Sequence, residues 1–187
     1  GFYFIVYPRT RQYELDVLPD RGDLQLVLPK NTAATAAAVA ALAEIASSPN
    51  FKAAYPAAAN EYLAKAVLGW QFLQNAIAQH GRDGAYQMVT FSGDVFMHDD
   101  ELAWAAAALF VATGDPAYDA ALRSQVPDPN DQSLRRWSWW SMFGGYGCAF
   151  RDYAFAVRSG RLSAAQLDGS YLAKCEAEIR RAATNVI

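Results

Sequence analysis

The sequence has little of what disulfide-stabilised domains, nucleic-acid-binding proteins and membrane spans require. Only two of its 187 residues are cysteines, so we expect Cys148 and Cys175 to be buried thiols, with a single bridge as the less favoured alternative. The 16 lysines and arginines are scattered and the net charge is −3, so no nucleic-acid partner is predicted. No apolar run approaches the roughly 20 residues of a membrane helix, so no membrane partner is predicted.

The composition that remains is that of a folded chain of one domain. Hydrophobic residues make up 53% and charged residues 19% of the sequence. Aromatic residues reach 13%, which favours a site that stacks on a flat ligand. The chain opens with "GFYFIVYPRT", without methionine or a signal-peptide pattern, and closes inside a helical pattern. We therefore expect it to be a segment of a larger protein.

Helical signals begin only after residue 30. Residues 2–7 are predicted to be a short extended segment, and residues 8–30 a long irregular loop because they contain three prolines and a glycine. Asn31 or Thr32 can cap the first helix, and the spacing of "SAAQ" predicts a capping box at Ser163. The predicted helices are 32–47, 56–79, 100–113, 116–125, 143–158 and one that begins at Ser163.

The hydrophobic pattern alternates from one helix to the next. Helices 32–47 and 100–113 are apolar or small on every face, which predicts burial on all sides. Helix 56–79 and the last helix each have one apolar stripe, and Glu178 falls outside the second stripe. Inner helices covered on both sides, alternating with outer helices covered on one, predict an all-α fold of about three helical hairpins. A double-layered ring and a helical solenoid both fit, although the chain has no fixed repeat.

Three consecutive acids, Asp99, Asp100 and Glu101, stand before the apolar helix in "HDDELAWAAAALFVATGD". Such acids can cap a helix, because its first N–H groups and the positive end of its dipole attract carboxylates. They can also hold a metal or act in catalysis. The two histidines lack a partner motif and are not predicted to be ligands.

This stretch resembles the signature of glycoside hydrolase family 9, in which an acid pair precedes an aromatic, small residues and "ATGD". Three further blocks agree in order: "LPKNTAATAAAVAALAEIASSPNFKAAYP", "YLAKAVLGWQFL" and "RRWSWWSMFGGYGCAFRDYAFAVRSGRL". The resemblance implies part of an (α/α)6 toroid. It makes residues 1–187 part of the catalytic domain, with 1–30 a loop or extended segment and 31–187 the hairpins.

The resemblance also implies a structural calcium and no other cofactor. Many members of the family hold this ion with a Ser-Gly pair, the Asp-Glu of the signature and a later aspartate. Ser92, Gly93, Asp100 and Glu101 match the first two parts, but "DVFMH" separates them and no aspartate follows Trp140 within reach. Helix capping and calcium binding both remain open for the acids.

The implied activity is hydrolysis of β-1,4-glucosidic bonds in cellulose or related β-glucans, with inversion, by a secreted enzyme. Trp140, Phe91, Trp139 and Tyr146 are the expected sugar contacts. The family's motifs for the base aspartates and the acid glutamate are absent, and "DRGD" at 20–23 stands where the family has a different loop. We therefore expect the rest of the catalytic domain to supply the catalytic carboxylates, and this chain alone to be inactive. The alternatives are a non-catalytic helical scaffold that binds carbohydrate or protein, and a toroid hydrolase of another family.

Overall fold

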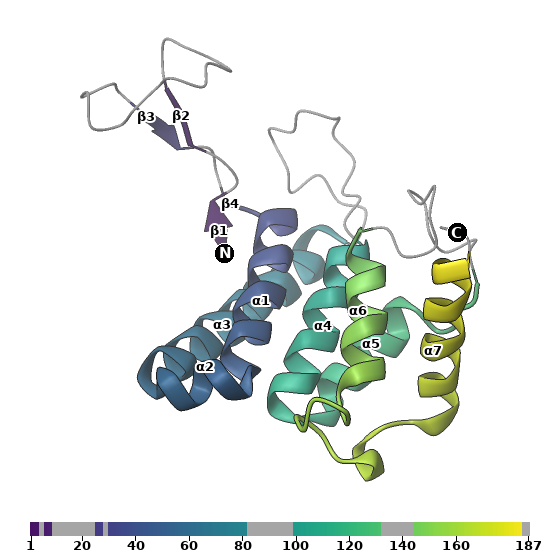
Figure 1. Cartoon of the computed structure of the whole chain (residues 1–187). Coiled ribbons are helices and arrows are strands. Elements are labelled where there is room, and N and C mark those ends of the chain that lie inside the picture. The colour runs from purple at the N-terminus through teal and green to yellow at the C-terminus, as the bar shows by residue number, and fades with distance from the viewer. Residues whose placement is uncertain (4–5, 9–24, 28–29, 82–98, 132–143, 185–187) are drawn as a thin grey trace.

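In a computed structural model, the chain folds into two layers of helices preceded by short paired strands (Figure 1). The structure describes residues 1–3, 6–8, 25–27, 30–81, 99–131 and 144–184. The prediction of an all-α fold is confirmed. The helices in these ranges are α1 (Thr32–Ser47), α2 (Pro49–Ala54), α3 (Pro56–His80), α4 (Asp99–Thr113), α5 (Pro116–Gln125), α6 (Gly144–Phe155), the 3-10 helix η3 (Ala164–Gln166) and α7 (Gly169–Thr184).

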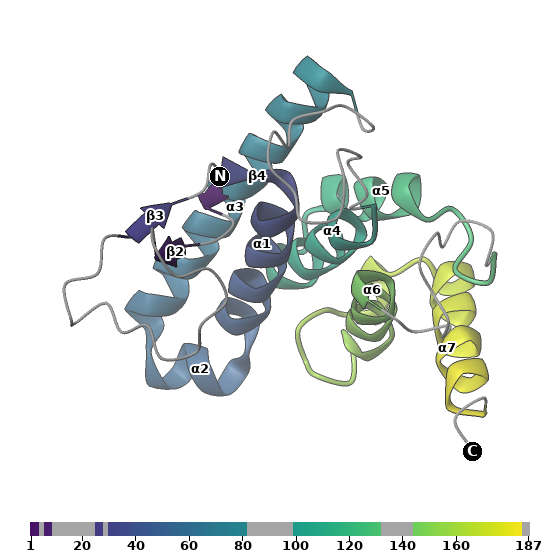
Figure 2. The ribbon, with the colours of Figure 1, turned by 90° about the horizontal axis from the view of Figure 1, so that it is seen from above.

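The helices form three hairpins. The inner helices α1, α4 and α6 lie side by side in that order, and α3, α5 and α7 each pack on the inner helix that precedes them (Figures 1 and 2). The inner helices run in one direction and the outer helices return in the other (Figure 1). This confirms the predicted hairpins and is the arrangement of part of an (α/α)6 toroid. None of the described helices is long and apolar enough to cross a membrane.

The central inner helix is the most deeply covered. Between Leu102 and Val111 of α4, every residue is buried except the half-buried Trp104. Helix α1 was also predicted to be buried on all sides, but Ala37 is half-buried and Ile45 is 41% exposed. The difference follows from position, because α4 has an inner helix on either side, whereas the described residues place one beside only one flank of α1.

The N-terminal segment is more ordered than predicted. Strand β1 (Phe2–Tyr3) pairs antiparallel with β4 (Lys30–Asn31), and β2 (Val6–Pro8) pairs with β3 (Gln25–Val27). The amide of Phe2 donates to the hydroxyl of Thr35 at 2.8 Å, which attaches β1 to α1. The prediction of an irregular loop over 8–30 was therefore wrong at residues 8, 25–27 and 30. These strands are only two or three residues long, and their partners are distant in the sequence. They are therefore too short to show the alternation of polar and apolar residues by which a strand is predicted.

Proline, glycine and cap signals located most of the helix ends. The Asn31 carboxamide accepts a hydrogen bond from the amide of Ala34 at 2.7 Å and caps α1, as one of the two predicted candidates. Gly114 follows α4 with a φ of 71°, as expected of a C′ glycine. Pro49 ends α1 as predicted, but it also begins the unpredicted helix α2.

Two boundaries near the C-terminus differ from the prediction. Helix α6 ends at Phe155 rather than Arg158, because the Ala156 carbonyl accepts from the amides of Arg161 and Leu162 in a tight turn. The capping box at Ser163 is present, but it caps only η3. Helix α7 begins later, where the carboxylate of Asp168 accepts from the amides of Ser170 and Tyr171 at 2.9 and 3.0 Å.

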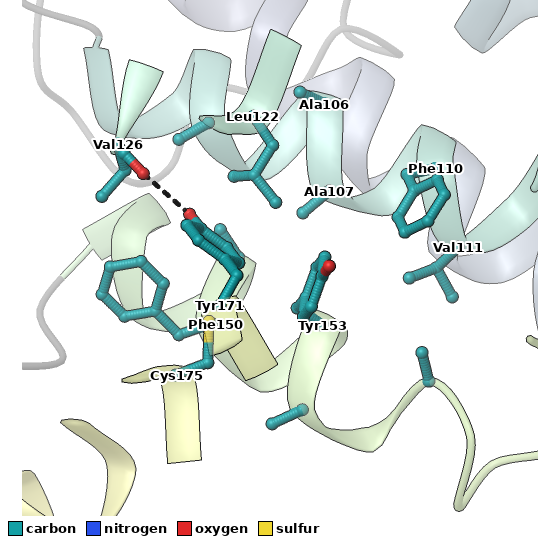
Figure 3. Close-up of a cluster of buried hydrophobic side chains, with 14 of the residues drawn as sticks. Ala106, Ala107, Phe110, Val111, Leu122, Val126, Phe150, Tyr153, Tyr171 and Cys175 are labelled. Atoms are coloured by element: carbon teal, nitrogen blue, oxygen red, sulfur yellow. Dashed lines mark hydrogen bonds between the residues drawn. The ribbon is translucent and has the colours of Figure 1, made fainter. Parts of the chain in front are cut away.

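An aromatic cluster joins the second and third hairpins (Figure 3). Phe110 of α4 stacks on Tyr153 of α6 with ring centroids 5.9 Å apart, and Tyr153 meets the edge of Tyr171 of α7 at 5.1 Å. The Tyr171 hydroxyl donates to the carbonyl of Val126 at 3.0 Å, so the polar end of this ring is satisfied. Cys175 is buried in this cluster, as predicted for a thiol, whereas Cys148 is only half-buried; both are free.

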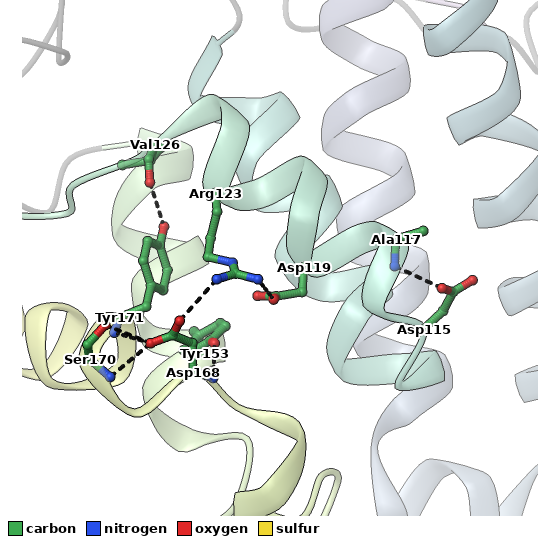
Figure 4. A network of polar contacts seen from close by, with 9 residues as sticks. All are labelled: Asp115, Ala117, Asp119, Arg123, Val126, Tyr153, Asp168, Ser170 and Tyr171. Atoms are coloured by element: carbon green, nitrogen blue, oxygen red, sulfur yellow. Dashed lines mark hydrogen bonds and ion pairs between the residues drawn. The ribbon is translucent and has the colours of Figure 1, made fainter.

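Ion pairs at the outer layer add to this link (Figure 4). Arg123 of α5 pairs with Asp119 at 2.7 Å and with Asp168, before α7, at 3.0 Å. The amide of Asp168 donates to the Tyr153 hydroxyl at 2.9 Å. The network therefore holds α5, α6 and the start of α7 in one arrangement.

Glu178 was predicted to lie outside the buried face of α7, and this was wrong. Its side chain is fully buried, and both of its carboxylate oxygens accept hydrogen bonds from Arg181, at 2.7 and 2.9 Å. A buried carboxylate requires such a partner. The stripe pattern missed it because hydrophobic periodicity counts every charged residue as exposed.

The first turns of α4 and α6 are in unusually close contact at Gly145. A β-carbon at position 145 would lie 2.3 Å from the carbonyl oxygen of Asp100 and 2.8 Å from the amide nitrogen of Glu101. Both are backbone atoms, so they cannot move without shifting α4. Glycine is therefore required for the two inner helices to approach this closely.

We predict that Gly145→Ala lowers the free energy of unfolding by about 1–3 kcal/mol, because the added methyl group forces the two helices apart. Urea unfolding followed by circular dichroism measures this. Gly169→Ala is the matched control, since a β-carbon at position 169 meets nothing within 4 Å and its φ is not positive. Equal stability of the two variants would contradict the close contact.

Candidate functional site

The candidate site is built at the N-terminal end of the inner layer. The first turns of α4 and α6 meet there. The segments that follow the two helices meet elsewhere, where a β-carbon on Gly114 would lie 3.6 Å from a methyl carbon of Leu162. Strand β4 leads directly into α1 at the same end as these first turns (Figure 1). Each inner helix thus begins at one end of the layer, and the segments 82–98 and 132–143 lead into α4 and α6.

Asp100 links the first turns of α4 and α6. One of its carboxylate oxygens, Oδ2, accepts a hydrogen bond from the amide of Gly145 at 2.9 Å. Gly144, which precedes it, has a φ of 66°, a conformation that side chains other than glycine rarely adopt. Helix capping was one of the two roles left open for these acids, and through this contact the carboxylate of Asp100 caps the neighbouring inner helix, α6.

Asp100 and Glu101 form a pair of interacting carboxyl groups. Burial, followed by the hydrogen bond and the negative charge of Glu101, raises the pKa of Asp100 to about 7, against the opposing effect of the Gly145 amide. The Glu101 side chain is itself half-buried. Negative charge is therefore unfavourable here unless a proton or a cation compensates it.

The two carboxyl groups fit part of a calcium site. Calcium binds hard oxygen donors, and a cation would relieve the repulsion that raises the pKa of Asp100. The other two predicted ligands, Ser92 and Gly93, lie outside the described residues. Within the described ranges, no group of three or more histidine, cysteine, aspartate or glutamate side chains is placed to hold a metal. Asp100 and Glu101 would thus need oxygen ligands from elsewhere.

The predicted sugar-contacting aromatics fall mainly outside the described part. Phe91, Trp139 and Trp140 lie in the segments before α4 and α6, which the structure does not describe. Tyr146 is described: it lies in the first turn of α6, is 7% exposed, and stacks on Phe150 with ring centroids 6.3 Å apart. Its ring packs in the core cluster, so only a small part of its surface is open to a ligand.

Sequence reasoning missed the contact between Asp100 and Gly145. The two residues are 45 positions apart, and no pattern in either segment specifies the other as its partner. The one available signal was the glycine pair in "FGGYG", because consecutive glycines at the start of a helix mark a close backbone approach.

A comparison with known protein families finds a match that covers the helices and the segments named above. The family model described as "Glycosyl hydrolase family 9" matches residues 23–185. The match includes all seven α-helices described above and both segments that lead into α4 and α6. No curated protein matches the chain.

We predict that Asp100→Ala lowers the free energy of unfolding by about 0.5–2 kcal/mol, as for other lost helix caps. Asp100→Asn is expected to lose less, because its amide oxygen can still accept from Gly145 while the repulsion with Glu101 is removed. Urea unfolding with EDTA present compares the two. An equal loss in both variants would argue against the hydrogen bond to Gly145.

Proposed function

Because the chain belongs to glycoside hydrolase family 9, we propose that it forms part of the cleft of a secreted enzyme that hydrolyses β-1,4-glucosidic bonds in cellulose or related β-glucans. Membership of the family implies that the enzyme hydrolyses glucans in general. We further propose that the bonds are β-1,4-linked, that hydrolysis inverts the anomeric carbon, and that the enzyme is secreted. The observation that supports it most is the family match over residues 23–185, which spans the whole helical layer.

We assign glucan binding to the segments that lead into the inner helices. Trp140, Phe91 and Trp139 are the proposed sugar contacts, with Tyr146 as a lesser one at the first turn of α6. Sugar rings present axial C–H groups that pack against aromatic faces, while their hydroxyl groups require hydrogen-bond partners at the edges. The family match includes all four positions.

We propose that the catalytic carboxylates are supplied by the rest of the catalytic domain. An inverting glycosidase needs an acid and a base about 6.5–9.5 Å apart, so that a water molecule fits beside the sugar. Asp100 and Glu101 are neighbours in direct hydrogen-bonding contact, which leaves no room for that water between them. Their proposed role is structural.

We also propose that Asp100 and Glu101 hold a calcium ion together with Ser92 and Gly93. The ion would neutralise the two carboxylates and join the start of α4 to the segment before it. This role is structural, and it requires no other cofactor.

We predict that the chain binds cellohexaose and releases no reducing sugar from carboxymethyl cellulose. Trp140→Ala should weaken binding by about tenfold or more, equivalent to about 1.4 kcal/mol, because a large stacking surface is lost. Isothermal titration calorimetry measures the affinity. Tyr55→Ala is the matched control, since Tyr55 is 61% exposed but lies at the junction of α2 and α3, at the opposite end of the layer (Figure 1).

Two results would count against this function. Release of sugar by the chain itself would show that it contains the catalytic pair. Absence of binding to cello-oligosaccharides, together with no glucan hydrolysis by the longer protein that contains the segment, would favour a non-catalytic helical scaffold.

For the metal, we predict that calcium raises the unfolding temperature of the chain and that EDTA reverses the effect, since a ligand that binds only the folded state stabilises it. The double variant Asp100→Asn, Glu101→Gln should lose this response. Glu61→Gln should retain it, because Glu61 is exposed on α3, where it pairs with Lys65. A calcium response that survives in the double variant would place the ion elsewhere.

A further inference from the structure

A second polar cluster joins the three inner helices away from their first turns. It consists of Glu44 near the end of α1, Trp104 on α4, and Arg151 and Asp152 on α6; we refer to it as the Glu44 cluster. The indole N–H of Trp104 donates to Oε1 of Glu44 at 2.6 Å. Arg151 lies 3.6 Å from the same oxygen and 3.9 Å from Oδ1 of Asp152. One carboxylate oxygen of α1 thus receives contacts from both of the other inner helices.

Asp152 is held where a negative charge is poorly compensated. It is 4% exposed, and its Oδ2 has no hydrogen-bond partner among the described residues. Arg151 lies 3.9 Å from Oδ1 of Asp152, and half of its side chain is exposed, so water screens its charge. Burial, followed by the hydrogen bond and the charge of Glu44, raises the pKa of Asp152 to about 8, against the opposing charges of Arg151 and Arg161.

The other charged groups near Asp152 are engaged with different partners. Arg161, in the turn after α6, donates to the hydroxyls of Ser47 at 3.3 Å and Ser159 at 2.9 Å. The thiol of Cys148 faces the same groups from α6, and burial raises its pKa, so it stays neutral. From α4 the cluster receives the neutral indole of Trp104, and on α7 the carboxylate of Glu176 pairs with Arg158 at 3.5 Å.

We propose that protonated Asp152 donates a hydrogen bond to Glu44 and that this bond is a pH-sensitive clasp between α1 and α6, which weakens as the proton is lost at alkaline pH. Loss of the proton leaves two negatively charged carboxylates beside one Arg151 nitrogen, which lies 3.6 Å from Glu44 and 3.9 Å from the buried Asp152. The clasp lies away from the proposed glucan site and does not depend on the proposed function.

The sign of the pH effect follows from proton binding in the two states. Between about pH 4 and pH 8, Asp152 is ionised in the unfolded chain and protonated in the folded one. The folded state therefore binds more protons, and its stability falls as the pH rises through this range. One such group changes the folding equilibrium constant by up to about tenfold per pH unit.

The test compares the pH dependence of urea unfolding, from pH 5 to 9, for the whole chain and three variants. The folding constant of the wild-type chain should fall steeply up to about pH 8. Asp152→Asn should have a shallower slope, because its amide can still donate to Glu44 but does not titrate, and Glu44→Gln should reduce the slope by removing the neighbouring charge. Glu61→Gln, on the exposed face of α3, should keep the wild-type slope. Asp100 titrates in every variant, so the difference between variants is the readout.

Carbon-13 NMR of aspartate-labelled chain gives a second readout that needs no variant to be stable. The Asp152 carboxyl resonance should titrate with a midpoint near pH 8, and Asp152→Asn identifies it where that variant folds. The Trp104 indole proton, which reports on Glu44, should shift over the same pH range. The proposal would be overturned if every aspartate carboxyl resonance titrated near pH 4. It would also be overturned if the folding constants of the wild type and of Asp152→Asn had the same dependence on pH.

Discussion

The close approach of α4 to its inner neighbours is the constraint on which the rest of the structure depends. Alanines at 105–108 let α4 pack against α1 and α6 at once, and all four are buried. Gly145 permits contact between backbones at the first turns, where any side chain would collide with Asp100. A protein interior is packed too densely to absorb even one added methyl group there. The small residues therefore determine how the beginnings of the inner helices, and with them the segments that precede those helices, are placed relative to one another.

Acidic side chains connect the helices once the small residues have brought them together. Asp100 joins α4 to α6 at their first turns, and Asp168 caps α7 while it pairs with Arg123 of α5. In the Glu44 cluster, the carboxylate of Glu44 on α1 similarly contacts Trp104 of α4 and Arg151 of α6. Each contact joins elements that packing alone would leave free to slide. Of the acids in the first turn of α4, Asp100 thus has a structural contact with α6.

Much of the fold could be predicted because its signals are local. Prolines at 56 and 116 and glycines at 81 and 114 mark helix ends that the structure reproduces within a residue. What could not be predicted depends on residues that are distant in the chain. Asp152 of α6, for example, is buried near Glu44 of α1, and burial and this neighbour together raise its pKa. Glu178 was missed for a different reason, because hydrophobic periodicity counts a charged residue as exposed even when Arg181, three residues away, pairs with it. For the site, sequence identified Asp100 as a candidate helix cap or calcium ligand but not Gly145 as its partner. The calcium and the sugar contacts remain predictions.

The central claim is that the helical layer is a scaffold and that glucan is bound by the segments leading into α4 and α6. Hydrogen–deuterium exchange of the chain with and without cellohexaose tests this most directly. The account predicts slower exchange on binding in residues 82–98 and 132–143 and in the first turns of α4 and α6, with α2, α5 and α7 unchanged. Slower exchange confined to the outer helices, with no change in those two segments, would contradict it.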